Sequence, residues 1–169
     1  MKKIAIAAIV GILLIGGVLP VEAATAPTKP TTTQKVQLQY LVEEEKLARD
    51  VYAYLAANVT SQKFSNITRS EQMHMDTISA LLKKYGVSNP VLTRSAGVFK
   101  DTKLQALYNS LTAQGSAGVA SAFEVGVAIE KLDISDLQKM ITTNAPTDIQ
   151  AAWTLLLNGS QNHLAAFSR

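Results

Sequence analysis

The 169-residue chain contains no cysteine, and this absence limits its chemistry before any motif is considered. Disulfides, zinc–thiolate sites, iron–sulfur clusters and cysteine nucleophiles are all excluded. A bound metal ion would have to be held by histidine and carboxylate side chains. Histidine is also scarce, since the chain has only His74 and His163.

A strong charge of one sign is also missing. The formal net charge is +3, but Lys2, Lys3 and Glu22 fall in a predicted leader, so the rest of the chain has 14 basic and 12 acidic residues. No cluster of lysine or arginine is longer than Lys83-Lys84, and no basic stripe carries interleaved aromatic residues. Nucleic-acid binding therefore has little support.

Residues 1–23 are predicted to form a secretory signal peptide. Two lysines precede an apolar run from Ile4 to Leu19, and Val21-Glu22-Ala23 supplies the small residues that suit a signal peptidase. The protein is then expected to be periplasmic or extracellular, with no membrane span after cleavage. Because the apolar run is close to the lower limit for a membrane span, an uncleaved anchor is the alternative.

The remaining chain is expected to form one folded domain over residues 34–169. Residues 24–33 are rich in threonine, proline and alanine and lack periodicity, so they predict a flexible linker. Apolar residues then recur at helical spacing in four long segments, which predicts an all-α four-helix bundle. The long helices are expected at about 34–58, 67–85, from 116 to before Asn144, and from Thr147 onward.

A short extra helix at about 102–114 is expected inside a long crossover between the second and third long helices. Helix caps are predicted from polar residues before the apolar stripes. Thr102 with Gln105 predicts a capping box, Ser116 and Thr147 predict N-caps, and Gly86 predicts a C-terminal cap.

Three consecutive glutamates interrupt the first helix. Successive helical residues point about 100° apart, so the three cannot share one environment. Only Glu45 lies on the apolar stripe, so Glu43 and Glu44 are expected to face water. A buried salt bridge from Glu45 to Arg49, one turn on, is the alternative to a ligand role for Glu45.

The other long helices also carry polar residues on their apolar stripes. The second has Glu71 and His74, the third has Glu130 with Asp133 at its border, and the fourth has Ser160 and His163. Each has a simpler alternative. The Glu-x-x-His could be a hydrogen-bonded pair, and His163 could be an ordinary core histidine. The two acids of the third helix could be paired with lysines. They could also be solvated at a helix end, because a new helix could start at Ser135.

Two further positions on these helices have specific expectations. Glu124 lies on another face of its helix, together with Lys131, and is expected to be exposed. Gly159 sits inside the last helix, where glycine costs about 1 kcal/mol relative to alanine. It therefore predicts close packing against a neighbouring helix.

Taken together, the four helices place four carboxylates and two imidazoles toward one core, with no inward lysine or arginine expected. This is the ligand complement of a di-iron or di-manganese carboxylate site, in which negative charge offsets two dications. The predicted metal ligands are Glu45, Glu71, His74, Glu130, Asp133 and His163.

The same motifs resemble a known family. Glu45-Lys-Leu-Ala-Arg49-x-x-Tyr52, Glu71-x-x-His74, Ile129-Glu130-x-x-Asp133 and Ser160-x-x-His163-Leu164 resemble the ferritin-like superfamily, nearest its rubrerythrin-type di-iron branch. The stretches Glu-Glu-Glu-Lys-Leu-Ala-Arg-Asp and Ser-Glu-Gln-x-His-Met more closely resemble the ferritin-like domain of unknown function 2202, over residues 36–167.

The resemblance implies a ferritin-like bundle in which Glu45, Glu71, His74, Glu130 and His163 bind two metal ions. The chain departs from the pattern at Ser160, where the superfamily usually has glutamate. Asp133 matches an extra acid of rubrerythrin-like proteins and could restore the number of carboxylates.

The expected function is that of an exported metal-binding protein with two iron ions, or manganese in their place. Oxygen or peroxide would be its co-reactant, in ferroxidase- or peroxidase-type redox activity. A rubredoxin-like Cys₄ electron donor is absent from the sequence. The alternative is a non-catalytic helical module of the cell envelope with a degenerate metal site. The metal, oxidant, electron donor and oligomeric state stay open, and a homodimer is compatible with the sequence.

Overall fold

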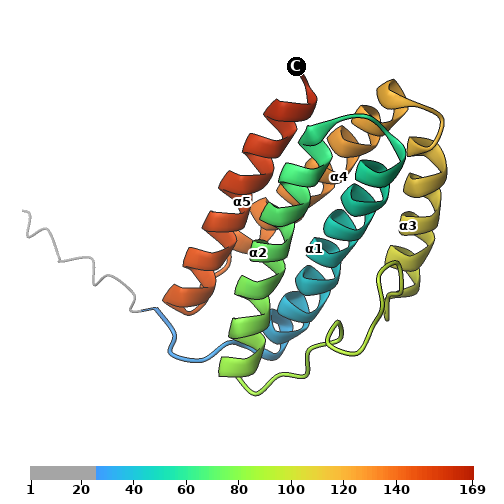
Figure 1. The fold of residues 1–169 in the computed structure, drawn as a ribbon. Helices are drawn as coiled ribbons and strands as arrows, with labels where there is room; N and C mark the ends of the chain where they lie inside the picture. The colour runs from blue at the N-terminus through green and yellow to red at the C-terminus, as the bar shows by residue number, and fades with distance from the viewer. Residues whose placement is uncertain (1–25) are drawn as a thin grey trace, which may run out of the picture.

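The computed structural model describes residues 26–169, and the predicted leader lies outside this range (Figure 1). The described part of the chain is all-α and forms a helical bundle, as predicted. None of its helices is long and apolar enough to span a bilayer. The five helices are α1 (Thr32–Asn58), α2 (Gln62–Lys84), α3 (Thr102–Gly115), α4 (Val119–Ile141) and α5 (Thr147–Phe167).

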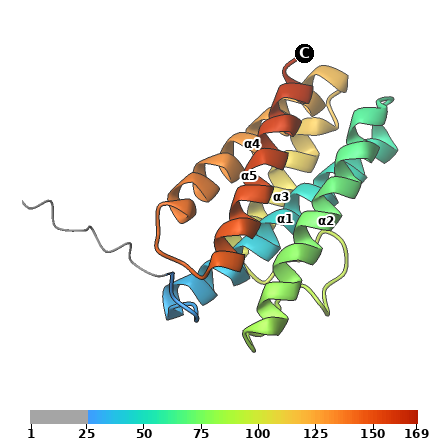
Figure 2. The same ribbon diagram turned by 90° about the vertical axis from the view of Figure 1, so that its left-hand side faces the viewer.

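The helices are arranged as two long hairpins with one short helix beside them. α1 packs along α2, and α4 packs along α5 (Figures 1 and 2). The hairpins meet where α2 contacts α5 and α1 contacts α4, while α3 packs on α1 and α4. Because α2 and α4 run in the same direction (Figure 1), the chain has to cross back between them, and residues 85–118 with α3 provide this crossover.

The apolar core consists of two clusters, one toward each end of the bundle. The first joins the beginning of α1 and α5 to the ends of α2 and α4, around Trp153. The second joins the end of α1 and α5 to the beginning of α2 and α4, around Tyr52 and Phe64. On all four long helices the positions between the clusters are occupied by polar residues. A buried polar layer therefore crosses the middle of the bundle.

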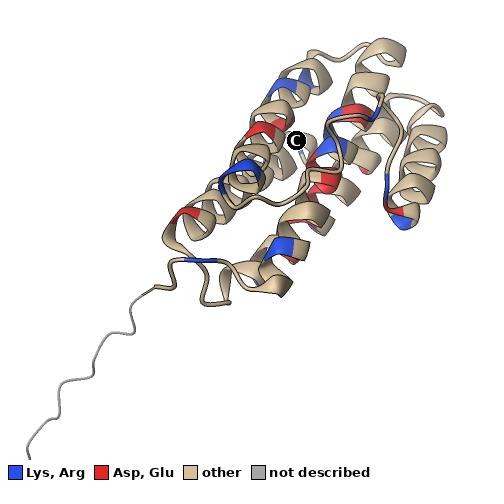
Figure 3. Cartoon of the chain, turned by 90° about the horizontal axis from the view of Figure 1, so that it is seen from below, with Lys and Arg blue, Asp and Glu red and all other residues tan. Residues whose placement is uncertain are grey.

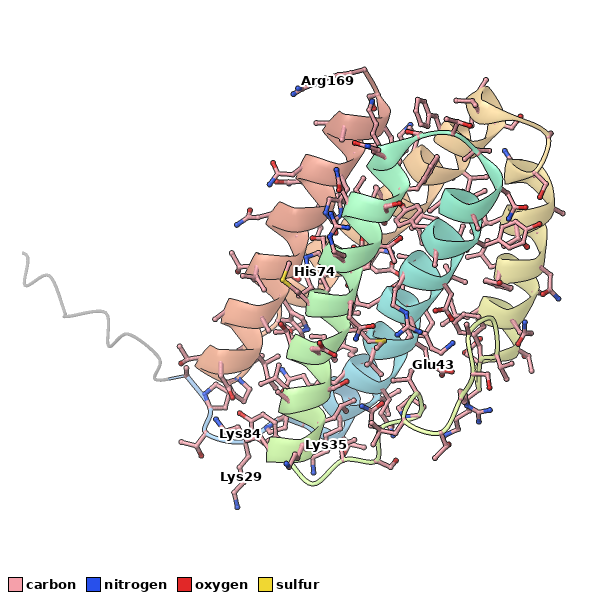
Figure 4. All side chains as sticks on the ribbon, in the orientation of Figure 1. Lys29, Lys35, Glu43, His74, Lys84 and Arg169 are labelled. Atoms are coloured by element: carbon pink, nitrogen blue, oxygen red, sulfur yellow. The ribbon has the colours of Figure 1, made fainter. Side chains whose placement is uncertain are left out.

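Helix α1 is buried on almost every side in this middle region. Residues 41–48 are all buried, because α2, α3, α4 and the crossover together surround them. The prediction that Glu43 and Glu44 face water is therefore wrong, since they are only 4% and 3% exposed. Glu43 accepts hydrogen bonds from the backbone N–H groups of Lys100 and Asp101, and it lies beside the crossover in Figure 4.

Lys46 is also inward, contrary to the expectation of no inward basic residue. Its ammonium pairs with Asp50, donates to the carbonyl of Ser95 (2.8 Å) and lies 4.4 Å from the centre of the Phe99 ring. Asp50 is therefore already the partner of this charge, so Lys46 is not available to neutralise the polar layer.

Asp50 has two further partners that fix the crossover and α1. It accepts from the backbone N–H of Gly97 (2.9 Å) and from the guanidinium of Arg49 (2.6 Å). Arg49 therefore pairs with Asp50, and the alternative of a Glu45–Arg49 salt bridge is not observed.

Basic and acidic residues are interspersed on the helices rather than gathered on one (Figure 3).

Several predicted helix starts and caps are shifted. α1 begins at Thr32, inside the predicted linker, and α2 begins at Gln62, five residues before its predicted start at 67. Asp101, not Thr102, caps α3 by accepting from the N–H groups of Lys103 and Leu104 (2.7 and 3.1 Å). Ser116 belongs to the end of α3, and α4 starts after Gly118, whose φ of 139° favours glycine. Thr147 is the first residue of α5 and is not its cap.

Helix α4 is continuous through Ser135, so the alternative of a new helix start there is excluded. The spacing of apolar residues in the sequence predicts a buried stripe through Val119, Phe123, Val127, Ile134 and Leu137. The observed buried face is rotated from it, because Val119 is exposed while Val125 and Ile129 are buried. Glu130 and Leu137 lie on both the predicted and the observed face. Glu124 is exposed, as predicted.

Replacing Asp50 with asparagine should destabilise the fold strongly, because Lys46 would stay buried without an anionic partner. Removing one member of a buried ion pair costs about 3–5 kcal/mol. Unfolding in urea measures this loss. The control is Lys139→Gln, which breaks the more exposed Lys139–Asp136 pair and should cost less than about 1 kcal/mol. Equal losses in both variants would contradict a structural role for Asp50.

Candidate metal centre

The buried polar layer contains every predicted ligand. α1 supplies Glu45, α2 supplies Glu71 and His74, α4 supplies Glu130 and Asp133, and α5 supplies His163 together with Ser160. All seven residues are at most 8% exposed. The helical spacing thus identified positions that the tertiary structure brings together from four helices.

Two groups of potential ligands share one residue, Glu71. The first group is Glu45, Glu71 and His74, and the second is Glu71, Glu130 and His163, each with its ligand atoms within 4.8 Å of one another. One Glu71 oxygen, Oε2, lies 2.8 Å from Nδ1 of His74, and the other, Oε1, lies 2.8 Å from Nδ1 of His163. The carboxylate therefore presents one oxygen to each histidine, which is the placement required of a bridging ligand.

The remaining contacts make the two groups similar but not identical. In the first, Nδ1 of His74 is also 3.2 Å from Oε2 of Glu45. In the second, Nδ1 of His163 is 3.6 Å from Oε1 of Glu130, and the hydroxyl of Tyr52 donates to that same oxygen (2.6 Å). The two imidazole rings face each other with centroids 5.7 Å apart. Figure 4 shows His74 on α2 facing α5.

Asp133 and Ser160 complete the layer on α4 and α5. The Ser160 hydroxyl donates to Oδ2 of Asp133, which ties this carboxylate of α4 to α5. Oδ1 of Asp133 and Oε1 of Glu45 are buried without a hydrogen-bond partner in the protein. Buried polar atoms almost always have a partner, so these two oxygens fit a site that accepts a cation.

Burial controls the protonation of three acids in this layer. It raises the pKa of Glu130 and of Asp133 to about 7, and it raises the pKa of Glu45 well above its ordinary value. For Glu71, burial also favours the neutral form, but close ion-pair contacts with His163 and His74 outweigh it and lower the pKa to about 2. Glu71 is thus the most strongly ionised acid of the layer.

The histidines shift in the complementary direction. Burial opposes their charged form, yet the nearby carboxylates of Glu130 and Glu71 raise the pKa of His163 to about 9, and the carboxylate of Glu71 raises that of His74. Without a metal ion, protons on the histidines balance the acids. Metal ligation requires neutral imidazole and ionised carboxylate, so a dication would displace these protons.

Gly159 fits the close packing predicted for it. A Cβ at this position would overlap Nε2 and Cε1 of His74. The absence of a side chain at this position therefore lets Nε2 and Cε1 of the His74 ring approach α5 closely, while Nδ1 points at Glu71 and Glu45.

The sequence reasoning missed two residues of this region. Tyr52 was placed on the apolar stripe, but its hydrogen bond to Glu130 was not anticipated. Its position seven residues after Glu45, on the same face of α1, was the available signal. Glu44 was assigned to the solvent although it is buried beside the layer.

Fold and site together define the class of protein: an all-helical bundle with a buried histidine–carboxylate cluster that could hold metal ions. The chain belongs to the family described as uncharacterized protein domain DUF2202, whose model matches residues 34–169. It is 42% identical over 147 residues to the uncharacterized protein MJ0754 of Methanocaldococcus jannaschii, covering 86% of this chain and 80% of that protein.

A solved relative has the same fold. The crystal structure of hypothetical protein MJ0754 superimposes on this chain with a TM-score of 0.80 and 42% identity, over 85% of this chain and 83% of that one. The family description and the names of these relatives give no activity, so the function has to be argued from the site.

Gly159→Ala should displace the His74 ring, because the new methyl group would overlap it. Overpacking of this kind typically costs about 1–3 kcal/mol. Denaturant unfolding measures the loss, and the NMR titration of His74 reports whether its pairing with Glu71 is weakened. Asn158→Ala, an exposed neighbour on α5, should stay within about 0.5 kcal/mol of the parent. A wild-type His74 titration in Gly159→Ala would contradict the packing argument.

The metal-free protein should lose stability as pH rises from about 5 to 9. Glu130 and Asp133 have raised pKa values, so their ionisation opposes folding increasingly up to pH 7 and beyond. Protonated His163 stabilises the fold through its contacts with the carboxylates. This contribution to the free energy of unfolding is fully present below the ordinary histidine pKa of 6.5 and is lost as pH rises through about 9. Glu71, with a pKa near 2, contributes a constant amount over this range.

Denaturant midpoints measured with a chelator present test this pH dependence. Glu130→Gln should flatten the pH profile, since it removes one of the groups that titrate. A stability that rises with pH over this range would contradict the assigned protonation states.

Proposed function

We propose that the chain is an exported, ferritin-like di-iron or di-manganese carboxylate protein, with ferroxidase- or peroxidase-type activity toward oxygen or peroxide. The observation that carries the proposal is the position of Glu71, whose two oxygens each face a different histidine at 2.8 Å. Two ligand groups that share one carboxylate suit two neighbouring ions better than a single one.

The charge of the layer supports the same conclusion. Glu45, Glu71, Glu130 and Asp133 could together carry four negative charges in a core where Lys46 is already paired with Asp50. Isolated charges in such a core are costly. Two dications would balance four carboxylates without any further residue.

Each side chain then has a definite role. Glu45 and His74 would hold one ion, Glu130 and His163 the other, and Glu71 both. Asp133 would stand in for the carboxylate that Ser160 lacks. Bound iron would supply electron transfer to oxygen or peroxide. The protein would orient the ligands: Tyr52 holds Glu130, and Gly159 leaves room for His74.

The ferritin-like assignment and the export both belong to this proposal. The two long hairpins, with α2 and α4 running in the same direction, support a ferritin-like arrangement (Figure 1). Export rests on residues 1–23 of the sequence, whose apolar run and small residues are typical of a signal peptide.

One observation favours a second candidate, a non-catalytic helical module of the cell envelope with a degenerate site. Asp133 is one methylene shorter than glutamate, and one of its oxygens already accepts from Ser160. A site reduced in this way would hold one ion or none, and the polar layer would then serve the packing of the helices.

Metal analysis separates the two candidates. Protein loaded with ferrous iron without oxygen should bind about two ions per chain, and oxygen addition should raise near-ultraviolet absorbance. His74→Ala and His163→Ala should each lower the metal content, while the exposed Glu124→Gln should not. No stoichiometric binding in the parent, together with histidine variants as stable as the parent, would favour the non-catalytic module.

A single ion per chain would instead point to Ser160. Ser160→Glu restores the missing carboxylate and should then raise the occupancy toward about two ions. An occupancy that stays at one ion in Ser160→Glu would contradict the role given to this position.

A further inference from the structure

The end of the bundle at which the described chain begins carries an excess of positive charge. Three segments meet at this end, namely the start of α1 with the residues before it (26–40), the end of α2 with the loop after it (78–95), and the start of α5 with the loop before it (142–154). Together they contain five basic residues and a single acid, Asp148. The basic residues are Lys29, Lys35, Lys83, Lys84 and Arg94.

Contacts between the three segments hold these residues at one end of the fold. The contacts are those of Lys84 with Asp148 (2.7 Å), Gln34 with the carbonyl of Asn144 (3.0 Å) and Gln39 with the carbonyl of Ser88 (2.9 Å). Figure 4 labels Lys29, Lys35 and Lys84 at this end, and Figure 3 views the bundle from it. The basic residues are therefore gathered by the tertiary structure, although the sequence contains no long run of them.

Most of this positive charge is not neutralised within the described part of the protein. Of the five basic residues, only Lys84 forms an ion pair with an acid of residues 26–169. The other three lysines are exposed. The last turns of α4 add no net charge, because Lys139 pairs there with Asp136.

Helix stability explains only part of this arrangement. Lys83 and Lys84 lie in the last turn of α2, where positive charge interacts favourably with the helix dipole. Lys35 is the fourth residue of α1, where the dipole has the opposite sign, and the first turn of α1 has no acid. The position of Lys35 therefore fits a role in binding better than a role in stabilising its helix.

Exposed apolar side chains lie among these lysines. Val36, next to Lys35, is 58% exposed, and Leu92 is 77% exposed. Leu92 lines an open groove together with Lys83 and Val87. Lysines beside exposed aliphatic side chains suit a membrane interface, because the ammonium groups meet lipid headgroups while the aliphatic groups reach the boundary of the acyl chains.

We propose that this end of the bundle, the basic end formed by Lys29, Lys35, Lys83, Lys84 and Leu92, binds the surface of a membrane that contains anionic lipids. Clustered lysines next to a membrane are attracted to such lipids. The lysines come from three separate segments and have flexible stems, so an extended charged surface suits them better than one small anion.

The sequence before the basic end supports the same choice of partner. The apolar run from Ile4 to Leu19 precedes the first described residue, Ala26, by six residues. During export, the membrane-directed leader is therefore expected to bring the basic end, rather than the opposite end of the bundle, to the lipid surface. The inference is independent of the proposed metal centre and adds a place of action to it.

Vesicle binding tests the proposal with the chain that starts at Ala24, which contains every described residue. Metal-free protein should sediment with vesicles of an equal mixture of phosphatidylcholine and phosphatidylglycerol, but not with phosphatidylcholine alone. Binding should weaken as salt is added, because salt screens exposed charges. Lys35→Gln and Lys83→Gln should each lower the partition coefficient about fivefold, since each removes one cation near the surface.

Matched variants make the test specific to the basic end. Lys131→Gln removes the same charge from an exposed position of α4 and should bind like the parent. Leu92→Gln should weaken binding without changing the net charge. Val119→Gln replaces an exposed apolar residue at the opposite end of the bundle and should leave binding unchanged.

Three results would overturn the proposal. The first is equal binding to both kinds of vesicle. The second is an equal loss in Lys35→Gln and Lys131→Gln, since net charge and not the basic end would then govern binding. The third is release of the protein from vesicles by inorganic phosphate at constant ionic strength, which would indicate a discrete site for a small anion.

Discussion

The placement of the Glu71 carboxylate between His74 and His163 is the interaction on which the rest of the site depends. Its 2.8 Å contact with His74 lies within α2, and its 2.8 Å contact with His163 joins α2 to α5 across the seam between the hairpins. Ion-pair contacts with both imidazoles keep Glu71 ionised despite its burial. Glu45 and Glu130 then lie next to the same two rings, so the position of one carboxylate organises ligands from all four long helices.

The surrounding structure packs around this arrangement and shields it from solvent. Apolar clusters around Trp153 and Tyr52 close the polar layer at both ends, which makes every charge within it costly unless it is compensated. Gly159 lets the His74 ring approach α5, and Tyr52 fixes Glu130. The Lys46–Asp50 pair anchors the crossover to α1, and its two charges neutralise each other without a residue of the polar layer. Protons balance the acids of the metal-free layer, and dications would take their place.

Helical periodicity predicted that the six central residues lie inward, because five of them lie on the apolar stripe of their own helix and Asp133 borders the stripe of α4. The same reasoning failed for Glu43, Glu44 and Lys46, since a helix covered from several directions has no solvent-facing side. The tertiary packing of the neighbouring helices and the crossover buries them, and no local pattern encodes this packing. Helix starts were misjudged near Ser116 for a related reason: two helices meet there within three residues, and polar residues of one helix end resemble caps of the next.

The central claim is that Glu71 bridges two ions, and anomalous X-ray diffraction tests it most directly. Crystals of the full chain, loaded with ferrous iron without oxygen, would be measured at energies above and below the iron absorption edge. The account predicts two anomalous peaks, one beside Glu45 and His74 and one beside Glu130 and His163, with the Glu71 carboxylate between them. A layer without peaks, or a single peak that does not contact Glu71, would contradict it.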